Sequence, residues 1–455
     1  MDVPLAAAAA GGNGEPPADG GTAGVPAGAA ARPQAWTPAD RAFMRRALAL
    51  AARARGRTHP NPMVGAVIVR EGTVVGEGFH RRAGAPHAEV EALRMAGPQA
   101  RGATLYVTLE PCCHHGRTPP CTDALIAAGL RRVVVAMPDP DPRVAGRGLA
   151  ALAAAGIQVA VGLEEAAARR LNEAYIVHRR LGRPMVTAKY AMTLDGRIAT
   201  ARGDSRWVTG ARARRWVHRL RDRVDAILVG VGTVLADDPE LTVRLHPGGR
   251  DPIRIVLDSR ARTPPTARVV QVARRSPAPT WVAVTPAAPA PRVRRLEAAG
   301  ARILTIPAGP DGRVALPYLL RTLAAEGVVH LLVEGGATVH GAFFGMGLVD
   351  RVVALVAPKL VGGQAAPGPV GGQGVARMEE APVLSGVFVR RLGRDWLIGG
   401  YLNDPVALED RAAPAPGPAP RGPAIDPGTA APAPRAGAPA RPSGPADPVE
   451  GGRPG

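Results

Sequence analysis

Three potential metal ligands and one carboxylate follow one another in the first half of the sequence. His87 is followed two residues later by Glu89, and Cys112 and Cys121 come after them. One imidazole and two thiolates leave the fourth position of a tetrahedral zinc ion open for water, as a catalytic site requires. Zinc held in this way would bring the pKa of its water towards neutrality and supply hydroxide. Glu89 is then placed to take the proton of that water and to return it to leaving ammonia.

The order of these residues is typical of zinc nucleoside deaminases, which carry H-x-E followed by P-C and a second cysteine. The sequence departs from that pattern because eight residues, rather than two, separate Cys112 from Cys121. A structural zinc held by the three cysteines and either His114 or His115 is the alternative, but it leaves the His-Ala-Glu unit unexplained. Cys113 is adjacent to Cys112, which disfavours it as a third ligand, so we expect it to be a small packed side chain.

Strands that alternate with helices are expected to position these residues. Thr37, with proline at the first helical position, predicts a helix that runs to about Arg55. A further helix is expected from near His87, and Glu164–Leu181 is predicted as one helix that leads to a domain boundary. Apolar runs predict strands at 63–70, 73–79, 103–109, 132–136 and 157–162. This alternation is typical of an α/β layered sheet.

The second half of the chain repeats the alternation of strands and helices. Apolar runs predict strands at 185–192, 226–230, 252–258, 280–284, 301–306 and 352–356, then a hairpin of 386–392 and 395–402. The strand–Gly–Gly–helix unit at 328–344 would present free backbone N–H groups to a bound anion, although a simple tight connection is the alternative. Neither this unit nor the Gly-rich segment 230–239 is G-x-G-x-x-G, so the ordinary Rossmann fingerprint is absent.

Composition divides the chain into four parts. Residues 36–182 and 183–403 form two α/β domains, between low-complexity segments at 1–35 and 404–455. The two end segments contain too few large apolar side chains to offset the entropy of ordering, so we expect disordered tails. Three clustered cysteines favour a metal site in a reducing compartment over a disulfide framework. With neither a signal peptide nor a membrane span in view, the sequence predicts a cytoplasmic protein with no membrane partner.

The formal charge of +19 suggests a nucleic-acid binder at first sight. Lys189 and Lys359 are the only lysines among 57 basic residues, however, which indicates a compositional bias of the genome. A nucleic-acid base deaminase with an RNA-binding appendage would need clustered basic and aromatic residues beyond the zinc half, where alternating α/β elements lie instead. A zinc module that only binds partners would need neither Glu89 nor an open coordination position. We therefore expect a small-molecule enzyme with no nucleic-acid partner.

Three runs of the first half resemble the bifunctional deaminase–reductase family of riboflavin biosynthesis: THPNPMVG (58–65), PHAEV (86–90) and TLEPCCHHGRTPPC (108–121). The resemblance implies a cytidine-deaminase-like α/β/α layered domain, in which the insertion between the cysteines shapes the pocket for a phosphoribosylated diaminopyrimidinone. It implies that Asn61 and His80 contact the pyrimidine and that His114 and Arg117 meet the substrate from the insertion. Arg117 is implied as the phosphate partner, because a guanidinium group forks onto phosphate oxygens. Ordinary loop residues are the alternative for His80, His114 and Arg117.

The second half resembles the reductase half of the same family through KYAMTLDGR (189–197), SRWVT (205–209), GVGT (230–233), LTVR (241–244) and VEGG (333–336). This resemblance implies a dihydrofolate-reductase-like α/β domain that uses NADPH. Lys189 and Asp237 are candidates to assist hydride transfer. Core packing is the alternative for Leu241 and Trp207. The resemblance assigns Ala191, Trp207, Thr233, Asp237, Ser259, Gly336, Ala337, Thr338, Val339, His340, Gly341 and Ala342 to the cofactor, and Ser205, Arg221, Leu241, Arg244 and Glu334 to the phosphoribosyl substrate.

Over residues 36–403, the resemblance implies two successive reactions. The first is zinc-dependent hydrolytic deamination of 2,5-diamino-6-(5-phosphoribosylamino)pyrimidin-4(3H)-one, with Glu89 as acid and base. The second is NADPH-dependent reduction of the ribosyl side chain of 5-amino-6-(5-phosphoribosylamino)uracil to ribityl. The expected partners are these small molecules. A homo-oligomer, or activity in one half alone, is compatible with the sequence.

Overall fold

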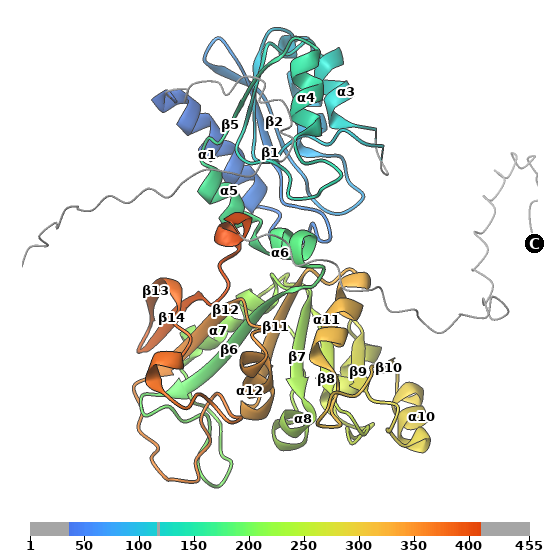
Figure 1. Cartoon of the computed structure of the whole chain (residues 1–455), viewed down its shortest axis with the longest axis vertical. Coiled ribbons are helices and arrows are strands. Elements are labelled where there is room, and N and C mark those ends of the chain that lie inside the picture. Colours follow the sequence, from blue (N-terminus) through green and yellow to red (C-terminus); the bar gives the residue numbers. More distant parts are fainter. Residues whose placement is uncertain (1–35, 116–118, 411–455) are drawn as a thin grey trace, which may run out of the picture. The chain divides into compact units, whose positions relative to one another are not determined.

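A computed structural model describes residues 36–115 and 119–410 of the 455-residue chain, and they form two sheets (Figure 1). Arg117, the predicted tail at 1–35 and residues 411–455 of the predicted tail at 404–455 lie outside the described residues. The described chain continues past residue 403 into a short 3-10 helix, η4 (Pro405–Asp410), in a segment predicted as part of the tail. None of the helices described is long and apolar enough to cross a membrane.

The first sheet has five strands in the order β2-β1-β3-β4-β5. β1 is antiparallel to both of its neighbours, whereas β3, β4 and β5 are parallel. All five strands lie where the apolar runs predict them, and most are slightly shorter than predicted. Their bounds are β1 (Gly65–Arg70), β2 (Thr73–Phe79), β3 (Thr104–Val107), β4 (Arg132–Val135) and β5 (Gln158–Val161).

Helices cover both faces of this sheet, which confirms the predicted α/β/α layers (Figure 1). One core joins the sheet to α2, α3 and α4, and the other joins it to α1, α5 and α6. Thr37 caps α1 through a reciprocal capping box with Asp40, as the sequence predicts. The helices are α1 (Pro38–Ala52), α2 (Ala88–Ala96), α3 (Cys121–Ala127), α4 (Arg147–Ala154), α5 (Glu165–Leu171) and α6 (Glu173–Leu181), with the 3-10 turn η1 (Gly97–Ala100).

The prediction of one helix over Glu164–Leu181 is wrong, because the chain breaks between α5 and α6 at Asn172. The Asn172 side chain donates to the carbonyl oxygen of Met63 at 3.0 Å and accepts from the Met63 N–H at 2.8 Å. Both hydrogen bonds are buried, so a contact that is distant in sequence overrides the helical pattern.

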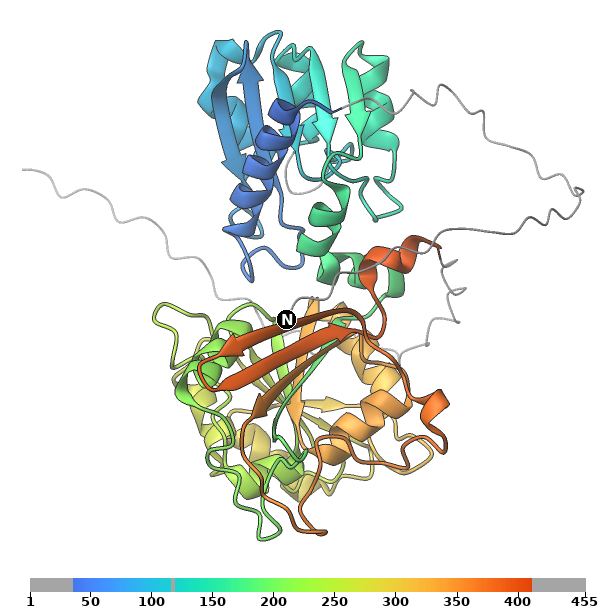
Figure 2. The same cartoon turned by 90° about the vertical axis from the view of Figure 1, so that its left-hand side faces the viewer.

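The second sheet has nine strands in the order β10-β9-β8-β7-β11-β6-β12-β14-β13. Its strands are parallel except at the end, where the predicted hairpin of β13 and β14 joins β12 in antiparallel pairing and turns at Gly393 (Figure 2). The strands are β6 (Met185–Thr193), β7 (Ala226–Gly230), β8 (Ile253–Leu257), β9 (Thr280–Val284), β10 (Arg302–Thr305), β11 (His330–Gly335), β12 (Arg351–Ala357), β13 (Ser385–Leu392) and β14 (Asp395–Tyr401).

Two cores lie on opposite faces of the central strands of this sheet. Ala226 and Leu228 of β7 pack into one core, and Ile227 and Val229 pack into the other. Burial on both faces explains why these strands are continuous apolar runs in the sequence. The helices are α7 (Ala211–Arg221), α8 (Val231–Asp237), α9 (Arg268–Gln271), α10 (Ala290–Ala298), α11 (Leu316–Ala325) and α12 (Ala337–Gly345), with the 3-10 turns η2 (Val272–Arg274) and η3 (Met378–Glu380).

Candidate active sites

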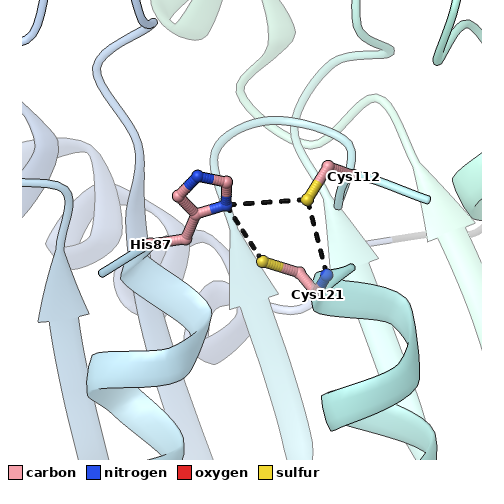
Figure 3. A group of neighbouring side chains, drawn as sticks. All are labelled: His87, Cys112 and Cys121. Atoms are coloured by element: carbon pink, nitrogen blue, oxygen red, sulfur yellow. Dashed lines mark hydrogen bonds between the residues drawn. The ribbon is translucent and has the colours of Figure 1, made fainter. Parts of the chain in front are cut away.

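The predicted zinc ligands come together where two helices begin (Figure 3). His87 immediately precedes α2, Cys121 is the first residue of α3, and Cys112 lies in the segment that follows β3. The His87 Nδ1 atom is 3.2 Å from Cys121 Sγ and 3.6 Å from Cys112 Sγ. All the ligand atoms of this group lie within 4.8 Å of one another. Cys113 is outside the group, and its side chain is half-buried.

The donor set suits zinc in its chemistry as well as in its spacing. A hydrogen bond with Cys121, together with His87, lowers the pKa of the Cys112 thiol to about 4. The same shared proton raises the pKa of Cys121. The backbone N–H of Cys121 also donates to Cys112 Sγ at 3.4 Å. A thiolate is the form that binds metal, so this surrounding favours coordination.

Glu89 lies in the first turn of α2 and is only 3% exposed. Burial raises the pKa of its carboxyl group to about 7. A group with a pKa near the working pH can both accept and return a proton during a reaction. The position and the environment of Glu89 therefore suit the acid and base role that the sequence predicts.

Asn61 and His80 form a fixed pair at the same cavity. His80 Nδ1 is 3.1 Å from the carbonyl oxygen of Pro86, which can only accept, so this nitrogen carries the proton. His80 Nε2 then accepts from Asn61 Nδ2 at 3.1 Å. Burial lowers the pKa of His80, which favours this neutral form. The pair leaves the Asn61 Oδ1 atom available to a substrate.

These residues line a cavity of about 540 Å³, to which His114 also contributes. Asp139, Asp141, Arg143 and Tyr175 also line this cavity, and their part in it was not predicted from the sequence. Three of these residues lie in the segment that follows β4, and ligands commonly bind beyond the carboxyl ends of parallel strands. That position is the sequence signal that could have identified them.

The second sheet carries a larger cavity, of about 1370 Å³. Lys189 and Glu334 lie at its wall, and α12 begins at its edge after Gly336. Gly336 has a φ of +70°, a conformation that favours glycine. Most of the residues predicted for the cofactor line this cavity: Ala191, Thr233, Asp237, Ser259, Gly336, Ala337, Thr338, Val339, His340 and Ala342.

A largely buried charge cluster includes Lys189 and Glu334 of this wall. Glu334 accepts from Arg221 Nε at 2.8 Å and from Arg221 Nη2 at 2.9 Å. Lys189 Nζ donates to the same carboxylate at 3.4 Å. Burial raises the pKa of Glu334, but the charges and hydrogen bonds of Arg221 and Lys189 outweigh this effect and hold the pKa well below its usual range. The cluster carries one negative and two positive charges, so it suits an anionic or electron-rich ligand.

The other residues predicted for the substrate are not all brought together. Ser205 lines the cavity and donates to Asp237 Oδ1 at 3.1 Å. Leu241 is buried in the core with a φ of +55°. Arg244 is exposed, and neither it nor Arg221 lines the cavity as described.

Two residues predicted for the cofactor also lie apart from the cavity lining. Trp207 is 57% exposed, and its carbonyl oxygen accepts from Lys359 Nζ at 2.6 Å. Gly341 lies on α12 at a close backbone approach, because a Cβ atom there would be 2.2 Å from the oxygen of Gly371. Gly341 therefore permits packing beside the cavity rather than lining it.

His218 lies one turn before Arg221 on α7, and its side chain is buried. Burial, with the charges of Arg221 and Arg244, lowers the pKa of His218 to about 4. Its Nδ1 atom is buried without a hydrogen-bond partner among the described residues. The folded protein therefore holds this imidazole neutral at a pH where a free histidine is protonated.

This depressed pKa predicts a pH-dependent loss of stability. Below a pH of about 6.5, the unfolded chain protonates His218 and the folded chain does not, so the free energy of unfolding falls as the pH falls towards about 4. We expect His218→Gln to lose less stability than the wild type between pH 7 and pH 4.5. Urea unfolding followed by tryptophan fluorescence measures this, because four of the five tryptophans lie in the second half. Equal slopes for the two proteins would contradict the prediction.

Comparison with known proteins identifies both halves. Residues 37–137 match the cytidine and deoxycytidylate deaminase zinc-binding region, and residues 184–398 match the RibD C-terminal domain. The riboflavin biosynthesis protein RibD of Escherichia coli K12 is 47% identical over 368 residues, which cover 78% of this chain and 97% of that protein. The chain belongs to the RibD family. RibD of Aquifex aeolicus is 44% identical over 359 residues, with 79% of this chain and 97% of that protein covered.

Solved RibD structures have the same fold. Acinetobacter baumannii RibD superposes with a TM-score of 0.72 at 40% identity, over 80% of this chain and 98% of that chain. The Thermotoga maritima diaminohydroxyphosphoribosylaminopyrimidine deaminase/5-amino-6-(5-phosphoribosylamino)uracil reductase superposes with a TM-score of 0.69 at 36% identity, over 80% and 98%. The predicted family and fold class are therefore confirmed.

Membership of the RibD family makes this protein a bifunctional deaminase and reductase of riboflavin biosynthesis that uses zinc and NADPH. The donor set of His87, Cys112 and Cys121 fits zinc, since it offers one nitrogen and two sulfurs and leaves a position open. The larger cavity fits a dinucleotide, because its volume is about 1370 Å³ and the N–H groups at the start of α12 can bind a phosphate.

Proposed function

We propose that the first domain hydrolytically deaminates 2,5-diamino-6-(5-phosphoribosylamino)pyrimidin-4(3H)-one. We further propose that the second domain reduces the ribosyl side chain of the product, 5-amino-6-(5-phosphoribosylamino)uracil. The observation that carries the first assignment is a buried carboxyl group, Glu89, which lines one cavity with His87 and Cys112 of the histidine–cysteine cluster. The Thermotoga maritima relative, whose name specifies these two activities, supports both substrates.

In the deaminase site, His87, Cys112 and Cys121 would hold the zinc ion. When bound, zinc supplies a hydroxide nucleophile near neutral pH. Glu89 accepts the proton released from the attacking water and donates it to the departing amino nitrogen, so that ammonia leaves and a carbonyl oxygen replaces it. The buried carboxyl group, with its pKa near 7, suits both transfers.

Asn61 and His80 would orient the pyrimidine in this cavity. The Asn61 amide is held by its hydrogen bond to His80, which is itself fixed by the Pro86 carbonyl group. Asn61 Oδ1 therefore faces the substrate as an acceptor for a ring N–H or amino group. We propose that His114 and Arg117 contact the phosphoribosyl part, as the family resemblance implies.

In the reductase site, NADPH supplies the hydride. Glu334 and Lys189 lie side by side at the cavity, where they can hydrogen-bond to the ribosyl hydroxyl groups and the ring amines. We propose that Arg221 acts by holding Glu334 in place, because the two groups form a two-pronged ion pair. Ser205 and Asp237 form a second polar pair at the cavity, and we assign Asp237 to the cofactor.

The remaining substrate and cofactor assignments are proposals that rest on the resemblance. We propose domain limits of 36–182 and 183–403, which the matches at 37–137 and 184–398 support. We also propose that the enzyme acts in the cytoplasm on small molecules, without nucleic acid. Exposed Val387, Val389 and Trp396 on the outer hairpin favour a homo-oligomer, because exposed apolar edge strands are normally covered.

Incubating the pure protein with the diaminopyrimidinone phosphate, with and without NADPH, tests this function. We expect ammonia release that does not need NADPH. We expect NADPH oxidation only with the deaminated compound, or with its precursor after deamination. A protein that releases no ammonia from this substrate would contradict the proposal for the first domain. A protein that releases ammonia but oxidises no NADPH would contradict it for the second.

Zinc removal should separate the two activities. Because His87, Cys112 and Cys121 belong to the first domain alone, dialysis against a zinc chelator should abolish ammonia release and leave reduction of the deaminated substrate unchanged. Added Zn²⁺ should restore ammonia release. Zinc content per chain and the two rates are measured on the same sample. Ammonia release that persists after complete removal of zinc would contradict the assignment.

A further inference from the structure

Glu110 is a buried carboxylate to which neither the proposed chemistry nor the family resemblance assigns a role. It lies two residues before Cys112, is 3% exposed, and belongs to the lining of the deaminase cavity. Its backbone N–H donates to the carbonyl oxygen of Met137 at 3.0 Å. This hydrogen bond joins the segment before Cys112 to the segment that follows β4. A buried carboxylate needs partners for both of its oxygens.

Within the described residues, Glu110 accepts four hydrogen bonds, and all come from backbone N–H groups of one loop and the helix after it. Oε2 accepts from Asp139 at 3.1 Å and from Gly146 at 3.0 Å. Oε1 accepts from Gly148 at 2.9 Å and from Leu149 at 3.3 Å. One side chain therefore holds both ends of the loop 139–146 and the first turn of α4.

These hydrogen bonds replace a missing helix cap. Gly146 is the residue before α4, and it has no side chain that could accept the N–H groups of the first turn. Glu110 supplies the missing acceptor from a distant part of the chain, and its negative charge is favourable at a helix N-terminus. The start of α4 thus depends on the segment that leads to Cys112.

Backbone packing strengthens the same junction. A Cβ atom on Gly148 would lie 2.1 Å from the Pro111 oxygen and 3.2 Å from Glu110 Oε1. The start of α4 is therefore in direct contact with the backbone next to Cys112. The two segments can move only together, because no space separates them.

The loop that Glu110 holds forms part of the wall of the deaminase cavity. Asp139, Asp141 and Arg143 of this loop line the cavity together with His87 and Glu89. Within the loop, Arg143 and Asp141 form an ion pair at 2.7 Å. The distance between the substrate-facing wall and the metal cluster therefore depends on Glu110.

We propose that Glu110 is a positioning residue for deamination, which holds the 139–146 loop at a fixed distance from the Cys112 segment. The inference rests on the proposed deaminase function. The loop lines the same cavity as His87 and Cys112, so loosening the loop weakens the binding of substrate while the metal ligands stay in place. Residues that position an active site through other groups typically affect activity by about 10-fold to 100-fold.

The Glu110→Gln variant tests the proposal, because an amide nitrogen replaces one carboxylate oxygen. Whichever way the amide is turned, its NH₂ group faces two backbone N–H donors, so two of the four hydrogen bonds are lost. We expect the KM for ammonia release to rise about 10-fold or more. We expect one zinc per chain, and NADPH oxidation with the deaminated substrate within about twofold of the wild type. Glu77→Gln, which removes a surface pair with Arg46, is the matched control and should behave as the wild type.

The readouts separate the possible outcomes. An unchanged KM in Glu110→Gln would overturn the proposal. A fall in kcat with an unchanged KM would also overturn it, because a general structural defect lowers kcat in this way. Loss of zinc with a KM that returns when zinc is added would also overturn it, since Glu110 would then serve the metal alone. Wild-type protein that releases no ammonia would instead refute the proposed function.

The Gly148→Ala variant gives a second test in case Glu110→Gln does not fold. Its Cβ atom would push α4 away from Pro111 while the Glu110 carboxylate stays intact. We expect the same rise in KM with zinc retained. In the double variant, KM should rise by less than the product of the two single fold-increases, because both changes act on one junction. A Gly148→Ala protein with the wild-type KM would overturn the proposal.

Discussion

Replacing Glu89 by glutamine should lower ammonia release by roughly 100-fold to 10,000-fold, which is the range for loss of a general acid and base. Glutamine has nearly the same shape, but it can neither accept the proton of the attacking water nor return one to the leaving nitrogen. Because Glu89 is not in the cluster of metal ligands, zinc content should remain at one per chain. Ammonia release under single-turnover conditions, with zinc measured on the same sample, checks both expectations.

The control for this variant lies on the same helix. Glu91 is two residues further along α2, and its side chain pairs with Arg94 at 3.1 Å at the surface. Glu91→Gln should keep wild-type ammonia release. Both variants should oxidise NADPH with the deaminated substrate at the wild-type rate, which shows that the chain is folded. Near-normal deamination by Glu89→Gln would refute the role of Glu89.

Glu334→Gln should have the largest effect in the second domain. The change leaves Arg221 and Lys189, two largely buried cations, without their shared negative partner. Breaking a buried ion pair from one side typically costs about 3–5 kcal/mol of stability. A displaced Lys189 should also lower the kcat/KM of reduction by about 100-fold, since small displacements in an active site have effects of that size. Urea unfolding and NADPH oxidation measure the two effects.

A matched variant distinguishes this result from a general effect of removing a charge. Glu326 also forms a two-pronged pair with an arginine, Arg302, but at the surface. Exposed pairs contribute about 0–1 kcal/mol, so Glu326→Gln should change neither stability nor reduction appreciably. Ammonia release should be unaffected in both variants. Equal losses of stability in Glu334→Gln and Glu326→Gln would contradict the prediction, because burial of the cluster would then add nothing to the cost of the change.

The zinc ligands and Glu89 could be proposed from the sequence because they lie in two short segments of the chain. His87 and Glu89 lie on one helix start, and the two cysteines lie at the ends of a single connection. Residue type and spacing therefore carry most of the information about this site. The strands could be predicted for a similar reason, because burial on one or both faces leaves apolar runs in the sequence.

The charge cluster of the second domain could not be predicted in the same way. The sequence indicates Lys189, Arg221 and Glu334 separately, but their contact depends on strand order. β11 lies beside β6, and the parallel register pairs Val333 with Ala188, so that Glu334 and Lys189 become neighbours. Neither strand order nor register follows from residue type. The pairing of Arg221 with Glu334 was therefore not predicted.

Side chains that bind a distant backbone were missed for a related reason. Asn172 interrupts a helical pattern because Met63 offers it two backbone partners. Glu110 lies in an otherwise apolar segment, and nothing next to it in the sequence indicates four N–H groups of residues 139–149 as its partners. Such contacts are decided by tertiary packing, which local propensity does not encode.

The hydrogen bonds of Glu110 reach only the main chain of the loop they hold, and this has an evolutionary consequence. Every residue type except proline offers the same N–H group, so the side chains between Asp139 and Gly146 can change without loss of the anchor. The backbone path of the loop can then stay the same while its side chains change. Selection can alter which groups face the substrate while the scaffold that presents them stays constant. Variation in this loop is thus a route by which one zinc deaminase scaffold can acquire new substrates.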